Sequence, residues 1–320
     1  MSIFQITVPH GGHLSRTMLV WLAAVLIWTM LPTPTLADNG KNIETPDTIV
    51  LGRVSNNPRK HYAALDALGR YLVEHCDWIE RHETVLASDN EEMIEFLRSG
   101  KVHLVSESAF SSILYEQAAD ARIFLRQWKG GRPSYQTFFF ARKDSDIRQI
   151  EDLAGNLIAF EDVGSTSGYF VPKATIAAQD LTLKFANEPR HTTDVGYLFA
   201  DSEVNIVAWV ARQKVDAGAT SDIHWDDTSR APPGLKRELR VFHKTPKIIR
   251  SVMVAGSGLD DGRLDQVSDI LLNMHDSAEG RDVLKNFYKT TRFDRLAGDA
   301  KASLDHVRSL FERGITAPPR

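Results

Sequence analysis

The sequence predicts an α/β protein, because segments typical of strands and segments typical of helices alternate along the chain. A first series occupies residues 48–141, and the pattern begins again after Lys143. The chain then ends in predicted helices over roughly residues 260–275, 277–288 and 298–313. Alternation of this kind favours a largely parallel sheet flanked by helices.

The first series has clear helix starts. A strand-like run covers Thr48–Val54, after which Asn57 is expected to cap a helix with Pro58 in its first turn. Ser88 and Glu91 have the spacing of a capping box before a second helix. The remaining predicted elements are the end of that helix at Gly100, a strand at Val102–Val105, a loop and helix over Ser106–Ala119, and strands near Ile123–Trp128 and Tyr135–Ala141.

The second series begins with a short helix that ends at Gly155 and a buried strand at Leu157–Phe160. Residues 221–237 are polar and rich in proline, so we expect a surface loop there. The other predicted elements are a helix over Val204–Gln213 and strands at Val215–Ala219, Leu239–His243 and Ser251–Ala255.

The loop after the buried strand is the most informative feature for function. Three consecutive hydroxyl side chains, Ser165, Thr166 and Ser167, precede Gly168, and Pro172 indicates the first turn of a helix. A helix N-terminus presents unpaired N–H groups and partial positive charge. Hydroxyls beside it suit a tetrahedral oxyanion such as phosphate or a phosphonate. An ordinary Ser/Thr helix cap is the alternative.

Catalytic motifs do not match this chain. A phosphate-binding NTPase loop needs Gly-Lys-Ser/Thr, but Tyr169 follows Gly168. A nucleophile elbow needs serine at its centre, where this loop has Thr166. The spacing of His75, Cys76 and His82 matches no zinc pattern. We therefore expect no metal, no cofactor and no catalysis.

The N-terminus and the composition indicate an exported protein. Arg16 precedes an apolar run over Met18–Leu31, and Thr35-Leu36-Ala37 fits a signal-peptidase site, with a disordered leader over residues 38–46. An uncleaved membrane anchor is the alternative. The net charge of -4, without a basic stripe, argues against nucleic-acid binding. Cys76 is the only cysteine, so no internal disulfide can form.

Four segments make the chain similar to the phosphate/phosphite/phosphonate-binding proteins of ABC importers. They are Asp152-Leu-Ala-Gly, Ile158-Ala-Phe-Glu-Asp-Val-Gly-Ser-Thr-Ser-Gly-Tyr, Val215-Asp-Ala-Gly-Ala and Phe287-Tyr-Lys-Thr-Thr-Arg-Phe-Asp. The resemblance implies a type II periplasmic binding fold, in which two α/β lobes joined by two crossover strands close on a ligand. It implies these boundaries: residues 47–140 plus 251–320 for lobe 1, residues 141–250 for lobe 2, and crossings at Phe138–Arg142 and Ile248–Val252.

The resemblance also implies which residues bind the ligand. Ser165, Thr166 and Ser167 would hold the anion together with the Gly168 amide. Two groups of side chains would complete the site: from lobe 1 the turn at Asn56-Asn57 with Tyr62, Ser106, Glu107, Ser108 and Phe110, and from lobe 2 Glu203 and Asp222. Caps, core side chains and solvated carboxylates are the alternatives for the members of both groups.

One departure from the family pattern concerns a histidine. Many relatives carry Gly-His or Gly-Asp-Asp where this chain reads Ala200-Asp201-Ser202-Glu203. Neither His191 nor His224 matches the family position well. The departure leaves the identity of the ligand open.

The sequence thus predicts a monomeric periplasmic receptor that captures a small oxyanion and presents it to the membrane permease of an ABC importer. A ligand-sensing partner of a sensor kinase is one alternative, and an exported phosphoester hydrolase is a weaker one. Carboxylates at Glu203 and Asp222 would repel a fully ionised inorganic anion, so a phosphonate is expected to bind better than orthophosphate.

The N-terminal pattern makes a direct prediction. Protein from the exporting host should begin near Asp38 and fractionate as soluble, because signal peptidase would remove the residues through Ala37. N-terminal sequencing of the soluble and membrane fractions checks this. Recovery of a chain beginning at Met1 or Ser2 from the membrane pellet would instead support an uncleaved anchor.

Overall fold

The computed structural model describes residues 47–55, 57–186 and 193–312. The predicted signal peptide and leader, together with Asn56 and His191, lie outside the described residues. Among the helices within these ranges, none has the length and apolar character needed to cross a membrane.

Segments from both ends of the described chain build the first sheet. Its strand order is β14-β4-β13-β3-β1-β2. Strand β1 runs parallel to β2 and β3, whereas β13 runs antiparallel to β3 and β4. The strands are β1 (Thr48–Val54), β2 (Arg81–Ala87), β3 (Leu104–Glu107), β4 (Arg122–Lys129), β13 (Val252–Ala255) and β14 (Thr290–Arg295).

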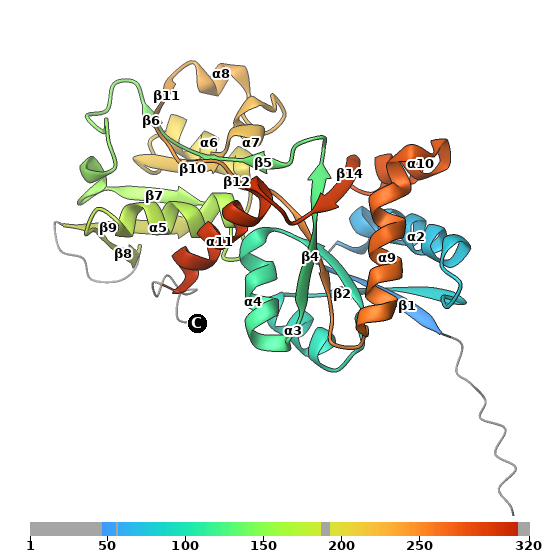
Figure 1. The fold of residues 1–320 in the computed structure, drawn as a ribbon. Coiled ribbons are helices and arrows are strands. Elements are labelled where there is room, and N and C mark those ends of the chain that lie inside the picture. Colours follow the sequence, from blue (N-terminus) through green and yellow to red (C-terminus); the bar gives the residue numbers. More distant parts are fainter. Residues whose placement is uncertain (1–46, 56, 187–192, 313–320) are drawn as a thin grey trace, which may run out of the picture. The chain divides into compact units, whose positions relative to one another are not determined.

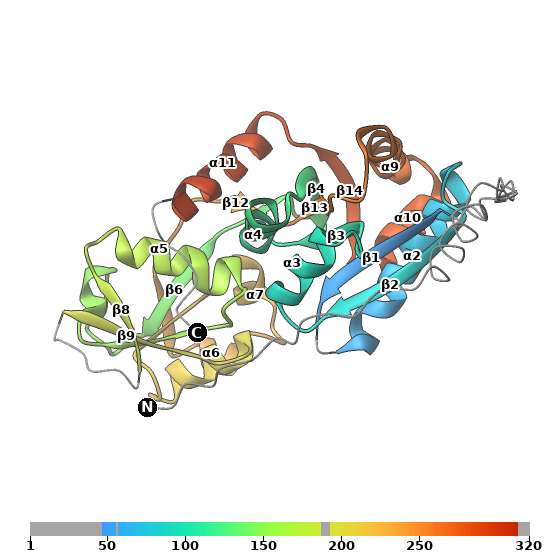
Figure 2. The same cartoon turned by 90° about the horizontal axis from the view of Figure 1, so that it is seen from below.

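Helices cover both faces of this sheet (Figures 1 and 2). Successive side chains of a strand point to opposite faces. Val50 accordingly belongs to the same buried cluster as Met93 of α3 and Leu304 of α11, whereas Ile49 belongs to the cluster that contains Leu68 of α2. The helices are α2 (Pro58–His75), α3 (Asn90–Arg98), α4 (Ala109–Ala119), α9 (Asp261–Asn273), α10 (Ala278–Asn286) and α11 (Asp299–Glu312).

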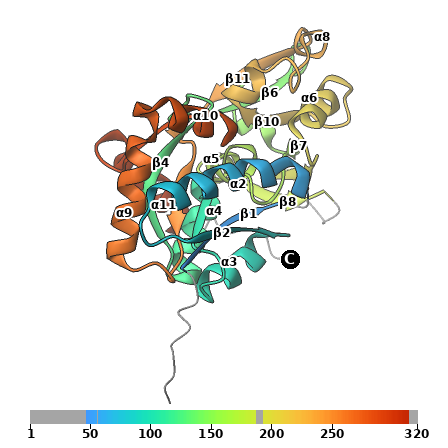
Figure 3. The same cartoon turned by 90° about the vertical axis from the view of Figure 1, so that its right-hand side faces the viewer.

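The middle of the chain forms a second six-stranded sheet, in the order β11-β6-β10-β7-β9-β8. One of its faces packs on Tyr169 and Ile176, and the other packs on Ile206 and Val210 of α6. Figure 3 shows α6 beside β7 and β10 of this sheet. The elements are β6 (Thr137–Arg142), β7 (Leu157–Phe160), β8 (Thr182–Phe185), β9 (Asp194–Phe199), β10 (Ala217–Ser221), β11 (Leu239–Lys244), α5 (Val171–Ala177), α6 (Glu203–Ala211), α7 (Asp222–Asp226) and α8 (Pro233–Lys236).

Two connecting segments join the sheets. Strand β5 (Ser134–Tyr135) pairs antiparallel with β12 (Ile248–Ile249) in a two-stranded ribbon. Strand β6 pairs along its length within the second sheet, and Val252 already pairs within the first. The connections therefore lie at residues 130–136 and 245–251, earlier than the resemblance implied. The lobe boundaries stay a prediction. These pairings would place the first boundary at about residue 136 rather than at residue 140.

The α/β class and the three C-terminal helices are confirmed, with two corrections. Both sheets are mixed rather than largely parallel. Strands β2, β8, β9 and β14 were not predicted. Three of these lie at sheet edges, and the half-exposed pattern of β2 and β8 gives a weak hydrophobic signal.

The start of α3 and the segment over residues 221–237 also differ from the prediction. The cap of α3 is Asp89, whose side chain accepts the Glu92 amide at 2.9 Å, one residue later than expected. The segment over residues 221–237 is not a plain surface loop, because it contains α7 and α8.

The packing of α6 on the second sheet generates a stability prediction. A Cβ at Gly218 would lie 2.5 Å from Cγ2 of Ile206, so Gly218→Ala should lower the free energy of unfolding by about 1–3 kcal/mol. Gly234→Ala is the matched control, since the nearest atom to its Cβ is 3.9 Å away. Urea unfolding measures both; equal stability of the two variants would contradict the packing argument.

Candidate functional site

A polar cavity of about 720 Å³ lies where strand ends of the two sheets meet. Strands β1, β3 and β4 end at Val54, Glu107 and Lys129, and these residues line the cavity from the first sheet together with Arg53. The loops after β7, β9 and β10 line it from the second sheet. Carboxyl ends of strands are the usual position of binding sites in α/β proteins. Its lining comprises Arg53, Val54, His61, Asn90, Glu107, Ser108, Ser111, Lys129, Tyr135, Glu161, Asp162, Gly164, Ser165, Thr166, Ser167, Asp201, Ser202, Glu203, Ser221, His224, Arg230, Arg250, Ser251 and Tyr288.

The predicted hydroxyl loop lines this cavity, but its members differ in what they bind. Residues Thr166–Phe170 form a π-helical turn that leads into α5. The Ser165 hydroxyl accepts the Gly168 amide at 2.9 Å and donates to Oε2 of Glu161 at 2.7 Å. Ser165 is therefore a helix cap, and the Gly168 amide is engaged by that cap.

Thr166 connects the loop to the first sheet's helices. Its Oγ1 accepts the backbone N–H of Phe110 in α4 at 3.0 Å, across residues far apart in sequence. The phenol of Tyr135 interacts with the hydroxyls of Thr166 and Ser167. Burial raises the pKa of Tyr135 to about 12, so this phenol is a neutral donor at ordinary pH. The cavity therefore holds a cluster of neutral hydroxyl groups.

Basic side chains also line the cavity, and sequence reasoning did not find them. Arg53 pairs with Glu107 at 3.0 Å, and Arg230 pairs with Glu203 at 2.5 Å. Arg250 donates to the carbonyl of Lys129, and no ion pair to it is found among the described parts of the chain. No local motif marks Arg250, because its neighbours come from strands distant in sequence.

The structure brings together only part of the predicted site. Ser165, Thr166, Ser167, Glu107, Ser108 and Glu203 line the cavity. Whether any of them contacts a ligand stays a prediction.

Five predicted residues do not line it. Tyr62 is 56% exposed on α2, and Ser106 donates to Gln127 at 2.6 Å inside a buried network. Phe110 stacks on Phe170 at 4.3 Å. Asp222 accepts the amides of Gln136 and Ile223, and Gly168 faces Glu161.

Glu203 lies in a cluster of opposite charges. Oε1 is 2.8 Å from Nδ1 of His224, a separation typical of an ion pair, although the ring N–H makes no aligned hydrogen bond. Burial opposes ionisation, yet His224 holds the pKa of Glu203 far below its ordinary value. His224 and Arg230 both come from the segment that was expected to be a surface loop.

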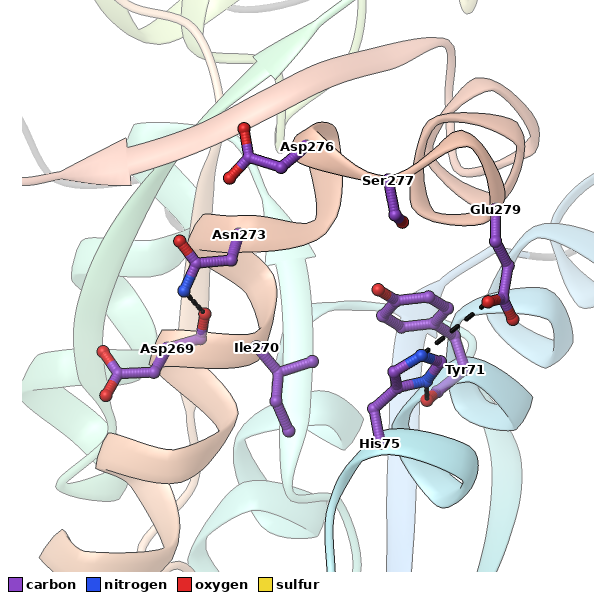
Figure 4. A pocket seen from close by; sticks show the side chains of 8 residues that line it. All are labelled: Tyr71, His75, Asp269, Ile270, Asn273, Asp276, Ser277 and Glu279. Carbon is purple, nitrogen blue, oxygen red and sulfur yellow. Dashed lines mark hydrogen bonds and ion pairs between the residues drawn. The ribbon is translucent and has the colours of Figure 1, made fainter.

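Carboxylate and imidazole groups come close together at two places. Atoms of Glu161, Glu203 and His224 lie within 4.8 Å of one another in the cavity, where Arg230 already compensates Glu203. A second hollow, of about 600 Å³, lies between α2, α9 and α10 (Figure 4). There His75 stacks on Tyr71 and lies 3.7 Å from Glu279. These groups are exposed, and surface carboxylates are common without a ligand.

Comparison with known proteins decides the family. Residues 54–300 match the family described as the periplasmic substrate-binding protein of phosphonate ABC transporters. The chain belongs to this family. The predicted resemblance is thereby confirmed over most of the chain.

Named relatives agree with that assignment. The phosphate-import protein PhnD of Mycolicibacterium smegmatis is 27% identical over 229 residues, which is 69% of this chain and 70% of that protein. The phosphonates-binding periplasmic protein of Escherichia coli is 26% identical over 204 residues, which is 62% of this chain and 58% of that protein. This second match thus spans less than two thirds of the relative's length.

Solved structures confirm the type II periplasmic binding fold. A Xanthomonas citri protein bound to chloride has a TM-score of 0.79 and 31% identity, covering 83% of this chain and 98% of that one. The same protein has been solved with ATP. PhnD1 of Prochlorococcus marinus, in complex with methylphosphonate, has a TM-score of 0.61 at 17% identity, covering 84% and 98% of the two chains.

Family membership establishes the general role. The protein is an extracytoplasmic substrate-binding component of an ABC importer, with a small ligand and a membrane permease as its partners.

The charge cluster around Glu203 makes a prediction about stability. Glu203→Gln leaves Arg230 and His224 without their carboxylate, so the free energy of unfolding at neutral pH should fall by about 1–3 kcal/mol. The folded-state pKa of Glu203 is lowered, so the difference from wild type should be full above its ordinary value of 4.5 and shrink as the pH falls below it.

The matched control for this variant is Glu95→Gln, which removes an exposed carboxylate beside Arg98. It should change stability by less than about 0.5 kcal/mol. Denaturant unfolding at several pH values measures both variants. A Glu203→Gln protein as stable as wild type at neutral pH would show that the cluster does not stabilise the fold.

Proposed function

We propose that the cavity captures a phosphonate or another substituted phosphorus oxyanion at the hydroxyl loop. The observation that carries the proposal is the convergence of Thr166, Ser167 and Tyr135 beside the cationic Arg250. Neutral hydroxyls can donate to several oxygens of a tetrahedral group. A guanidinium nearby supplies the counter-charge, and hydrogen bonds to ionised groups are the stronger kind.

The size of the cavity supports a substituted ligand. A cavity of about 720 Å³ is within the range of small-molecule sites, and it leaves space beyond a single tetrahedral group. Names of relatives point to phosphorus oxyanions of different size: phosphate in Mycolicibacterium smegmatis, phosphonates in Escherichia coli and ATP in Xanthomonas citri. The shared element is an oxygen-rich phosphorus centre.

The structure argues for a different reason why a phosphonate would bind better than orthophosphate. The sequence predicts that repulsion by Glu203 and Asp222 disfavours orthophosphate. Glu203 is compensated by His224 and Arg230, and Asp222 does not line the cavity. We therefore propose that space for an organic group, rather than repulsion by these two carboxylates, favours the phosphonate.

We further propose that the mature protein begins near residue 38, acts as a monomer without catalysing a reaction, and delivers its ligand to the permease. A sensor kinase is the alternative receiver. Co-purification with membranes that carry one or the other partner distinguishes these two roles.

Thr166 provides the test of the binding proposal. Thr166→Val removes a hydroxyl from the cavity, so affinity for methylphosphonate should fall by about 10- to 150-fold, which corresponds to a hydrogen bond to a charged group of about 1.5–3 kcal/mol. Thr166→Ser keeps the hydroxyl and should bind nearly as wild type. Calorimetry with methylphosphonate, orthophosphate, sulfate and an alkanesulfonate measures this. Equal affinity of the valine and serine variants would exclude Thr166 from the site.

A further inference from the structure

We propose that Glu161 must carry a proton for the cavity to accept an oxyanion, so that this carboxyl group determines the pH range of binding. The proposal deepens the proposed function, because it concerns the affinity of the same site for an anion. Nothing in the hydroxyl motif itself requires a glutamate at this position.

Glu161 is in direct contact with the hydroxyl loop, through Ser165. It follows the last residue of β7 and lines the cavity. Its Oε2 accepts a hydrogen bond from the Ser165 hydroxyl, with 2.7 Å between the two oxygens. Ser165 in turn caps the helical turn that begins at Thr166. An ionised carboxylate here would put negative charge beside the proposed place of the ligand's oxygens. Two negative charges that lie side by side in a partly buried site repel each other strongly.

The charged groups that face Glu161 come from three elements. The carboxylate of Glu203, at the start of α6, has an oxygen within 4.8 Å of one on Glu161, and Asp162 follows Glu161 in the loop. His224 of α7 lies within 4.8 Å, but its ring nitrogen faces Glu203, as does the guanidinium of Arg230. The positive charge in this part of the cavity is therefore directed at Glu203 rather than at Glu161.

Two carboxyl groups this close together in a largely buried site do not both ionise readily, because their like charges repel each other. Glu203, which is paired with Arg230 and lies 2.8 Å from the ring of His224, is the group that stays ionised. Burial first, and then the charges of Glu203 and Asp162, raise the pKa of Glu161 above its ordinary value of 4.5. The electrostatics thus agree with the geometry in assigning the proton to Glu161.

The sign of the pH dependence follows from this assignment. Below its raised pKa, Glu161 is neutral and the anion binds. As the pH rises through that pKa, Glu161 ionises and the affinity should fall, by at most about tenfold per pH unit. The free energy of unfolding should fall over a lower interval, from the ordinary carboxyl pKa of 4.5 up to the raised pKa of folded Glu161, because there the unfolded chain has lost the proton that the folded protein keeps.

The test compares wild type with Glu161→Gln, which mimics the protonated form. Kd for methylphosphonate is measured by calorimetry between about pH 5 and about pH 10, a range that extends well above an ordinary carboxyl pKa. Ionisation of the ligand affects both proteins and cancels in the ratio of their Kd values. We expect wild type to lose affinity relative to Glu161→Gln as the pH rises. A ratio that does not change with pH would overturn the proposal.

Unfolding of the ligand-free proteins gives a second readout that does not depend on the ligand. Wild type should lose stability relative to Glu161→Gln as the pH rises; parallel curves would overturn the proposal. If neither protein binds any phosphonate, the binding function fails, but these unfolding curves still decide the role of Glu161.

Asp162→Asn is the control variant for the identity of the protonated group. If Asp162→Asn abolishes the pH effect and Glu161→Gln does not, the proton belongs to Asp162. Stabilisation of wild type by Mn²⁺ or Zn²⁺, abolished in Glu161→Gln, would show a metal site instead.

Discussion

The arrangement of the cavity depends on the hydroxyl of Ser165. Its oxygen closes the turn at Gly168, and its hydrogen fixes the side chain of Glu161. This double use holds the loop in the shape that turns Thr166 toward α4. Thr166 then accepts the Phe110 amide, so one short loop connects the second sheet to a helix that covers the first.

Charge in the cavity is arranged in pairs rather than as a single positive surface. Arg53 is matched by Glu107, and Glu203 is matched on both oxygens by His224 and Arg230. Such pairs hold side chains in place without adding net charge. Selection of a ligand therefore depends on the few groups outside these pairs and on the neutral hydroxyls between them.

Local chemistry explains which features the sequence could predict. The hydroxyl loop, the Pro58 helix start and the C-terminal helices depend on residues close to one another in the chain, and their pattern is visible there. The strand order and the two connecting segments bring three other side chains to the cavity, and no local pattern specifies either feature. These side chains are His224, Arg230 and Arg250. The compensation of Glu203 could not be predicted for a related reason, because His224 and Arg230 lie beyond the end of α6, in a later segment of the chain.

The position of Arg250 has a mechanical consequence. It belongs to a connecting segment, next to the ribbon of β5 and β12, so it lies where the backbone must bend if the two sheets separate. An anion held between Arg250 and the hydroxyl loop would act as a removable crosslink between the bending segment and the second sheet. Opening an occupied cleft would then require work against that crosslink, and opening an empty one would not. A permease that accepts only the occupied form could sense this difference in stiffness rather than any change in surface.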